Sequence, residues 1–524
     1  MPLPEVFERL QREVAQRSLR STRVRKAVDV FYFHCLQQVD ALSPEFLRRV
    51  VDYFVLELFA PRQTPAFVLG ETMNEGAFAA MVKLLLAQQD LDAAWRLVND
   101  LCAVSSERVH FRTVGPIVEF LCQRQDFVDA MARWRRLKTV QMEWTPAMED
   151  TLVQLVIACV RHHHRIGGGS VDAVASEFTA QMQELLQDLK TATKTLSAEN
   201  GNRLRHAFTS AGFVVKSVVS DEQLLPSCAV CHTTLAKDHP TDDEQCRLVD
   251  AVETGALLKI KSNSITTKEF LAPFKHWLLS KHAAARKSGR LHYILDGPNI
   301  AYLNQNFDAG SFRFDHIDLV TRMLQAQGHE VSITIPFSYL EESSKLQIRT
   351  RKFKKLRKDG RVATRRRTDE EKAMIDRWRA ENLVFSCRTD YLSDDVFWLY
   401  ASALLGPEVR VVTNDQGRDH VYALLNTHKT AGDGRERISI DLIERWREST
   451  IVNIEIQHED LATFERQRSA SNGSAPLQIP VQDVRLVHPL PFTRVPQATH
   501  DGKFHFPIRT DNGGRRWLCV QRAS

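Results

Sequence analysis

The sequence predicts a multidomain protein in which an N-terminal α-solenoid is followed by an α/β domain with a parallel sheet. Three observations carry this prediction: a helical repeat near the N-terminus, a Cys-x-x-Cys pair in the middle, and strand-like runs alternating with helical ones further on. The length of 524 residues suits two to four domains. The share of hydrophobic residues, 43%, is that of a globular chain and argues against a disordered or fibrous one.

The first 205 residues are predicted to be helical, because apolar residues recur at spacings of three and four without strand-like alternation. Gln89–Ala94 is repeated as Gln125–Ala130, at an offset of 36 residues. Helix–turn–helix repeats of about this length build α-solenoids, in which each hairpin buries its apolar face on the next. We therefore expect a solenoid over residues 1–205, with an unrelated helical bundle as the alternative.

The middle of the chain holds the pair Cys228 and Cys231, whose spacing fits half of a tetrahedral metal site. Nine cysteines are too few for a disulfide framework in a chain of this length, and no signal-peptide pattern is present, so a metal is favoured over a disulfide. A chance pair is the alternative. No apolar stretch reaches the roughly 18 residues of a membrane span, and no membrane association is expected.

Residues 286–465 are predicted to form the α/β domain, because strand-like and helical patterns alternate there. The strand-like runs are Leu291–Leu295, Val331–Ile335 and Val409–Thr413, with helical patterns at Ile317–Gln327 and Val396–Leu405.

Aspartates stand where the strands of this domain end. Asp296 follows the first strand and Asp415 the last, so both are expected at the carboxyl edge of the sheet, where open α/β sheets bind ligands. Asp394 and Asp395 open the helical run behind Ser393, a candidate N-cap residue.

Clustered carboxylates repel one another unless a cation lies between them. Hard oxygen ligands without nearby His or Cys select Mg²⁺ or Mn²⁺. Two such ions support phosphodiester hydrolysis, one activating water and the other stabilising the leaving oxygen. Asp419, four residues after Asp415, is a further candidate acid. The alternative is that each aspartate is a separate turn or cap residue.

A basic run extends from Lys345 to Arg367, with twelve Lys or Arg and a single acid, Asp359. Such a run commonly contacts phosphates or serves as a nuclear localisation signal, whereas a solvated helix face carries mixed charges. The expected RNA-phosphate contacts are Arg351, Lys352, Lys354, Lys355, Arg365, Arg366 and Arg367.

The motifs Asp296-Gly-Pro-Asn299, Ser393-Asp394-Asp395 and Thr413-Asn414-Asp415, the last followed by Arg418-Asp419-His420, together resemble the metallonuclease domain of protein-only ribonuclease P. In that family the nuclease domain is PIN-like, of the NYN type, and the repeat near the N-terminus resembles its pentatricopeptide repeats. The resemblance implies an endonuclease that removes the 5′ leader of precursor tRNA without an RNA subunit. Pro298 and Gly417 depart from the family pattern but are not presumed ligands.

The resemblance also implies roles for individual residues. Catalytic Mg²⁺ or Mn²⁺, two ions, would be held by Asp296, Asp394, Asp395 and Asp415, with Asp419 as a further catalytic acid. Asn299, Arg418 and His420 would orient the scissile phosphate or the acids. One structural Zn²⁺ would be held by Cys228, Cys231, His505 and Cys519, in a central β-rich hinge domain split between residues 206–285 and 470–524.

Further expectations concern partners, location and the competing functions. The protein is expected to act as a monomer on precursor tRNA, in the nucleus or alternatively in the mitochondrion. One alternative function is a PIN/NYN-type ribonuclease that acts on other RNAs. The other is a non-catalytic pentatricopeptide protein that only binds RNA.

Overall fold

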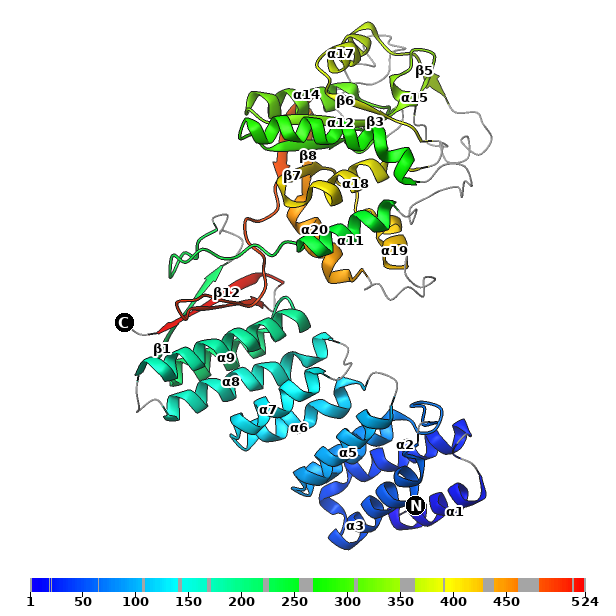
Figure 1. The fold of residues 1–524 in the computed structure, drawn as a ribbon, viewed down its shortest axis with the longest axis vertical. Coiled ribbons are helices and arrows are strands. Elements are labelled where there is room, and N and C mark those ends of the chain that lie inside the picture. Colours follow the sequence, from blue (N-terminus) through cyan, green and yellow to red (C-terminus); the bar gives the residue numbers. More distant parts are fainter. Residues whose placement is uncertain are drawn as a thin grey trace. The chain divides into compact units, whose positions relative to one another are not determined.

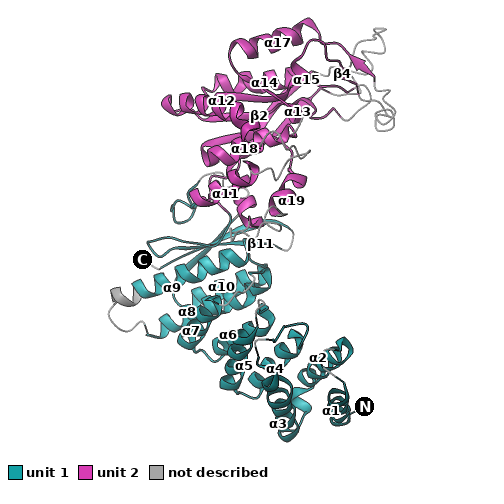
Figure 2. Ribbon diagram, turned by 45° about the vertical axis from the view of Figure 1, so that its right-hand side comes forward, with its two compact units in different colours: residues 1–236, 494–524 teal, residues 237–493 magenta. Residues whose placement is uncertain are grey.

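The computed structural model describes residues 2–17, 19, 21–64, 66–105, 109–139, 144–166, 171–219, 226–253, 267–305, 310–348, 363–389, 392–426, 438–459, 480–510 and 513–522. The chain forms two compact units, one made of Met1–Ala236 and Arg494–Ser524 and the other of Lys237–Thr493 (Figure 2). The division into three domains expected from the sequence stays a prediction. None of the helices in these ranges has the length and apolar character that a membrane span requires.

The first unit begins with a long succession of helices, which confirms the helical prediction (Figure 1). A π-helical turn at Tyr53–Phe59 follows α3. Helices α2, α4, α6 and α8 pack each against the next. The helices are α1 (Leu3–Gln16), α2 (Thr22–Gln37), α3 (Pro44–Asp52), α4 (Glu75–Ala87), α5 (Leu91–Val104), α6 (Phe111–Gln123), α7 (Phe127–Thr139), α8 (Glu149–Ile166), α9 (Val171–Ala192) and α10 (Ala198–Ser210).

The sequence repeat corresponds to two helix hairpins of the same local structure, α4–α5 and α6–α7. Gln89 and Gln125 lie in the turn after the first helix of each hairpin, with φ angles of 63° and 59°. The next residue of each copy caps the second helix: Asp90 accepts the N–H of Ala93 at 2.9 Å, and Asp126 accepts the N–H of Asp129 at 3.2 Å. The repeated sequence therefore encodes a repeated turn.

A four-stranded antiparallel sheet completes the first unit, in the order β1–β12–β11–β10. It joins segments from distant parts of the chain, because β1 pairs with β12 along its whole length. Apolar side chains of this sheet, such as Phe504 and Phe506, belong to the same core as the helices. The strands are β1 (Phe213–Val219), β10 (Gln497–Ala498), β11 (Phe504–Arg509) and β12 (Arg515–Arg522).

The second unit is built on a six-stranded mixed sheet in the order β6–β3–β2–β7–β8–β9. The first five strands are parallel, as predicted, and β9 runs antiparallel to β8. The predicted strands are confirmed, whereas β6, β8 and β9 add to them. The strands are β2 (His292–Asp296), β3 (Glu330–Pro336), β6 (Val384–Cys387), β7 (Val409–Val412), β8 (Ile451–His458) and β9 (Val481–Val487), with β4 (Leu346–Gln347) and β5 (Thr364–Arg365) forming a separate small ladder.

Helices cover both faces of this sheet, as a parallel sheet requires. Ile294 faces one core, with α11, α12, α18 and α20, whereas its neighbour Leu295 faces the other, with α14 and α17. Alternate residues of a strand point to opposite faces, so two layers of core result. The helices are α11 (Asp242–Glu253), α12 (Thr267–Lys287), α13 (Gly297–Ala301), α14 (Phe314–Ala326), α15 (Phe337–Leu340), α17 (Asp369–Ala380), α18 (Asp395–Leu405), α19 (Arg418–Asn426) and α20 (Ile440–Thr450).

Candidate active site and metal centre

Asp296 is the last residue of β2 and the N-cap of α13, with a side chain only 3% exposed. Its Oδ2 accepts a hydrogen bond from Thr413 Oγ1 at 2.7 Å, and its Oδ1 accepts the N–H of Asn299 at 3.3 Å. Burial raises the pKa of this carboxyl well above its usual value, the Thr413 bond opposes the shift, and the negative charges of Asp395 and Asp394 add to it. A buried carboxylate beside two others is the electrostatic setting that a cation would relieve.

Asp394 and Asp395 lie at the start of α18, as expected, but the predicted cap is wrong. Asp394, and not Ser393, is the N-cap residue. The Ser393 hydroxyl instead donates to the carboxylates, at 3.2 Å from Asp395 Oδ2 and 3.4 Å from Asp394 Oδ1. The serine hydroxyl thus orients the acids, and the serine main-chain carbonyl accepts the N–H of Val396 at 3.2 Å.

His420 joins the two helices of the site, since its Nε2 lies 3.2 Å from Asp395 Oδ2. Burial alone would raise the pKa of Asp395, but the hydrogen bond and charge of His420, with the Ser393 hydroxyl, outweigh it and lower the pKa. Asp395 is therefore held as a carboxylate while Asp296 is pushed toward its neutral form. The two acids have opposite electrostatic environments within one site.

Asp415 lies in the loop between β7 and α19, half-buried. Its N–H donates to Thr413 Oγ1 at 3.0 Å, and its Oδ1 accepts the N–H of Gly417 at 2.8 Å. Thr413 thus contacts both strand-end acids, because its hydroxyl donates to Asp296 and accepts from Asp415. The sequence prediction did not single out Thr413.

The remaining candidates divide into engaged and exposed side chains. Asn299 uses its Oδ1 to accept the N–H of Asn414 at 2.9 Å. Arg418 and Asp419 are exposed in the first turn of α19, with the Arg418 Nε donating to Gln416 Oε1 at 2.9 Å. Arg418 and Asp419 therefore face solvent and are accessible to a ligand.

The carboxylates do not converge on a single point. Within the described ranges, the one group of three or more Cys, His, Asp or Glu whose ligand atoms all lie within 4.8 Å of one another is a Cys/His cluster. Two-metal sites place their ions about 3.5–4 Å apart, so their carboxylates surround a wider space than one ion needs. The chemistry of the donor set fits hard divalent cations.

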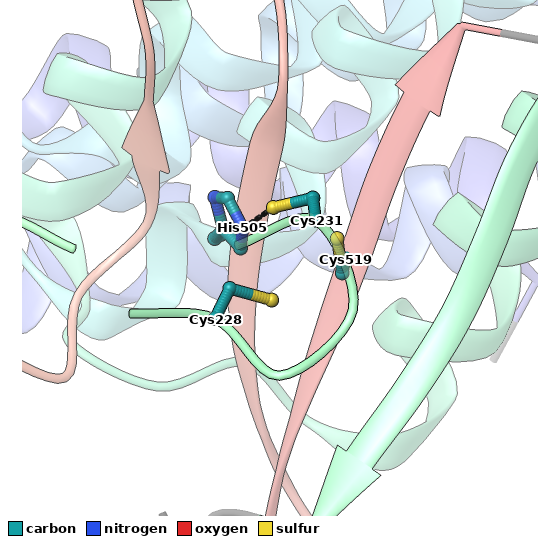
Figure 3. A group of neighbouring side chains, drawn as sticks. All are labelled: Cys228, Cys231, His505 and Cys519. Atoms are coloured by element: carbon teal, nitrogen blue, oxygen red, sulfur yellow. Dashed lines mark hydrogen bonds between the residues drawn. The ribbon is translucent and has the colours of Figure 1, made fainter. Parts of the chain in front are cut away.

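The Cys/His cluster unites Cys228, Cys231, His505 and Cys519 (Figure 3). His505 and Cys519 are directly opposite residues of β11 and β12, so their side chains lie side by side on one face of the sheet. The cysteine pair comes from a tight turn in which the N–H of His232 donates to the carbonyl of Cys228 at 2.8 Å.

The environment of this cluster suits a metal ion. Cys228, His505 and Cys519 are buried, and His505 Nε2 lies 3.3 Å from Cys231 Sγ. Hydrogen bonding from Cys519 holds the pKa of Cys228 far below its usual value, so at least one thiolate is favoured. Three sulfur ligands and one imidazole are the donors of a closed, structural metal site.

Of the predicted phosphate-binding residues, Arg351, Lys352, Lys354 and Lys355 lie outside the described residues. Arg365 forms an ion pair with Glu371 at 2.6 Å. Arg367 is buried, and its guanidinium donates to main-chain carbonyls, including that of Tyr339 at 2.6 Å. Arg365 and Arg367 therefore stabilise the local fold, and Arg366 is the exposed residue of the three.

No protein-family model matches the chain. Three curated proteins of Arabidopsis thaliana are similar in sequence. Proteinaceous RNase P 2 is 22% identical over 87% of this chain and 78% of its own length. Proteinaceous RNase P 3 is 24% identical over 87% and 72%, and the chloroplastic/mitochondrial proteinaceous RNase P 1 is 22% identical over 86% and 69%.

The fold also matches a solved structure over the full length of both chains. The crystal structure of nuclear proteinaceous RNase P 2 from A. thaliana gives a TM-score of 0.63 at 17% identity, and a second structure of nuclear protein-only RNase P 2 gives 0.59 at 16%. These findings confirm the family resemblance expected from the aspartate motifs: over most of its length the chain is similar in sequence, and over all of it in fold, to the proteinaceous RNase P proteins.

Proposed function

We propose that this protein is a protein-only ribonuclease P, a metal-dependent endonuclease that removes the 5′ leader of precursor tRNA and needs no RNA subunit. The observation that carries the proposal is the similarity to three proteinaceous RNase P proteins over at least 86% of the chain. The site supports it, because Asp296 ends β2, Asp415 follows the adjacent parallel strand β7, and the charges of Asp395 and Asp394 act on the Asp296 carboxyl.

In the proposed site, Asp296, Asp394, Asp395 and Asp415 would hold two Mg²⁺ or Mn²⁺ ions. Bound ions of this kind lower the pKa of an attacking water and stabilise the leaving oxygen. The protein's own contribution is positional: Thr413 and Asn299 fix Asp296, and His420 fixes Asp395. Arg418, which is exposed, is a candidate to orient the scissile phosphate, and Asp419, exposed beside it, is a candidate further acid of the site.

The Cys/His cluster would hold one structural Zn²⁺, which suits its three sulfur donors and one imidazole. This ion would fix the turn that carries Cys228 and Cys231 to β11 and β12, linking two chain segments some 270 residues apart. The helical hairpins of the first unit would form a pentatricopeptide-like solenoid that grips the folded part of the tRNA. Structured RNA is recognised in this way by shape, phosphates and 2′-hydroxyls.

The deciding experiment is cleavage of a 5′-extended precursor tRNA by the purified chain in Mg²⁺. The expected result is one cut at the mature 5′ end, with a 5′-phosphate on the tRNA. The double variant Asp394→Ala/Asp395→Ala serves as the inactive control. If the tRNA stays intact and unstructured RNA is degraded through the same aspartates, the chain is a ribonuclease of a different specificity. RNA binding without any cleavage would leave only the non-catalytic alternative.

Location in the nucleus is part of the proposal, with the mitochondrion as its alternative. It rests on the nuclear form named among the matched structures and on the basic run from Lys345 to Arg367. Because a mitochondrial relative is also similar, imaging of the tagged full-length chain decides between the two compartments.

A further inference from the structure

The side chain of Asn414 extends the pairing between β7 and β8 beyond the last residue of β7. Strand β7 stops at Val412, and one further main-chain bond follows, from the N–H of Thr413 to the carbonyl of Val452 at 3.1 Å. Asn414 Nδ2 then donates to the carbonyl of Ile454 at 2.7 Å, and its Oδ1 accepts the N–H of Ile454 at 2.9 Å. A carboxamide offers the same donor and acceptor as a peptide group, so this side chain stands in for the next strand residue.

The main chain of Asn414 is also fixed, by a hydrogen bond to a side chain of the active site. Its N–H donates to Asn299 Oδ1 at 2.9 Å, and the N–H of Asn299 donates to Asp296 Oδ1 at 3.3 Å. Thr413, the preceding residue, donates its hydroxyl to Asp296 Oδ2 at 2.7 Å. Together with the peptide bond between Thr413 and Asn414, these hydrogen bonds form a closed ring. The ring includes both carboxylate oxygens of Asp296.

Asp415 is attached to the same ring. It follows Asn414 in the chain, and its N–H donates to Thr413 Oγ1 at 3.0 Å. The position of its carboxylate relative to Asp296 is therefore set by the ring and by the anchor on Ile454. The flanking Asn414 backbone cannot turn without breaking either the bond to Asn299 or the pair of bonds to Ile454.

We infer that Asn414 is a positioning residue that sets the separation of Asp296 and Asp415 and thereby the affinity of the active site for divalent cations. This inference deepens the proposed function and rests on its metal-dependent site. Asparagine suits the position for a physical reason. Aspartate would bring a carboxylate oxygen against the carbonyl of Ile454, alanine would leave both main-chain groups of Ile454 unpaired, and glutamine is one methylene longer.

The test compares Asn414→Ala and Asn414→Asp with the wild-type full-length, zinc-loaded chain. Binding of Mn²⁺ is measured by calorimetry, with Asp415→Ala identifying the heat that belongs to the aspartate site. We expect the affinity of both variants to fall by about 10–100-fold, the usual effect of losing a residue that orients metal ligands. The Mg²⁺ concentration for half-maximal precursor-tRNA cleavage should rise in proportion, and cleavage at saturating Mg²⁺ should largely recover because the ligands remain.

The matched control is Asn453→Ala, an exposed asparagine on the same strand as Ile454 that should leave Mn²⁺ affinity unchanged. If Asn414→Ala does not fold, Asn299→Ala opens the ring from the other side with Ile454 still paired, and the same loss is expected. Folded variants that bind Mn²⁺ within twofold of wild type overturn the inference, as does an equal loss in Asn453→Ala. Calorimetry needs no RNA, so an effect on Mn²⁺ binding in a chain that fails to cut tRNA supports the inference while refuting the ribonuclease P assignment.

Discussion

His420 Nε2 lies 3.2 Å from Asp395 Oδ2 and connects the first turn of α19 to the first turn of α18. This contact is the principal reason that the pKa of Asp395 is lowered despite its burial. The two helices are separated in sequence by β7, so the contact fixes the loop after β7 against the acidic pair. Its removal should affect catalysis through the charge state of Asp395.

We therefore predict that His420→Ala lowers precursor-tRNA cleavage by about 10–100-fold at neutral pH, as for other residues that orient metal ligands. Without His420 the pKa of Asp395 rises, so the acidic limb of the pH–rate profile should move to higher pH. The profile of cleavage against pH at saturating Mg²⁺ measures this. His420→Gln, which keeps a hydrogen-bond donor but no charge, should shift the limb less, and an unshifted limb in both variants would show that His420 does not act through Asp395.

A second prediction concerns how far the buried carboxylate of Asp296 destabilises the fold. Asp296 is 3% exposed, and its raised pKa means that its ionisation opposes folding when no cation is bound. Because the folded pKa lies above that of the unfolded chain, this destabilisation is absent at low pH and appears as the pH rises through the unfolded value. Asp296→Asn should therefore raise the melting temperature of the zinc-loaded chain in Mg²⁺-free buffer at pH 7 by a few degrees while abolishing cleavage.

The control for Asp296→Asn is the addition of Mg²⁺. Mg²⁺ should stabilise the wild-type chain by binding the native state and should have little effect on the variant. A variant that melts below wild type in Mg²⁺-free buffer would contradict the electrostatic account of Asp296.

Parts of the fold could be predicted from the sequence because they depend on local patterns. The turns at Gln89 and Gln125 repeat because the residues around them repeat, and β2, β3 and β7 are short runs rich in β-branched residues or other apolar residues. Strand β8 also carried a signal, since Val452, Ile454 and Ile456 are buried while the residues between them are exposed. It was missed because it follows α20 without an intervening turn.

The aspartates of the site could be identified by their places after strands, but their supporting contacts could not. Thr413 contacts Asp296 across 117 residues of sequence, and the partner of the Asn414 side chain is the main chain of a strand that the sequence analysis did not identify. The cap assignment to Ser393 failed because α18 begins at Asp395, one residue later than assumed, so that Asp394 takes the N-cap position. Such choices depend on side chains that meet only in the fold.

A third prediction concerns the Cys/His cluster. The purified chain should contain one zinc per molecule by elemental analysis, and Cys231→Ser should lose it. The turn at Cys228 would then lose its attachment to β11 and β12, so the first unit should unfold at a lower temperature, consistent with the large share of folding free energy that structural zinc supplies. Cys246→Ser, at an exposed cysteine outside the cluster, is the matched control and should keep both the metal and the melting temperature.

A fourth prediction tests an ion pair that holds α20 to α11. Arg445 lies 2.6 Å from Glu244, and this pairing lowers the pKa of Glu244 to about 2. A carboxyl with a depressed folded pKa stabilises the fold above its unfolded value of about 4.5 and loses that effect as the pH falls toward 2. Glu244→Gln should therefore lower the melting temperature at pH 7, and the difference from wild type should shrink below pH 4.

The exposed pair of Asp369 and Lys372 provides the comparison for Glu244. Asp369→Asn should change the melting temperature little at any pH, because solvent screens an exposed pair. Equal effects of the two substitutions would mean that burial of the ion pair between Arg445 and Glu244 does not contribute to the stability of the fold.

The last prediction separates two neighbouring arginines of the basic run. Arg366 is exposed, whereas Arg367 is buried and donates to the carbonyls of Ser338, Tyr339, Glu341 and Ser344. Arg366→Ala should weaken precursor-tRNA binding uniformly across tRNA sequences and reduce the slope of log affinity against log salt by about 1, with no change in melting temperature. Arg367→Ala should lower the melting temperature, because four main-chain carbonyls each lose a hydrogen bond from the guanidinium. Binding measured across a salt series, beside thermal melting of both variants, distinguishes them, and a lowered melting temperature in Arg366→Ala with unchanged binding would exclude it as a phosphate contact.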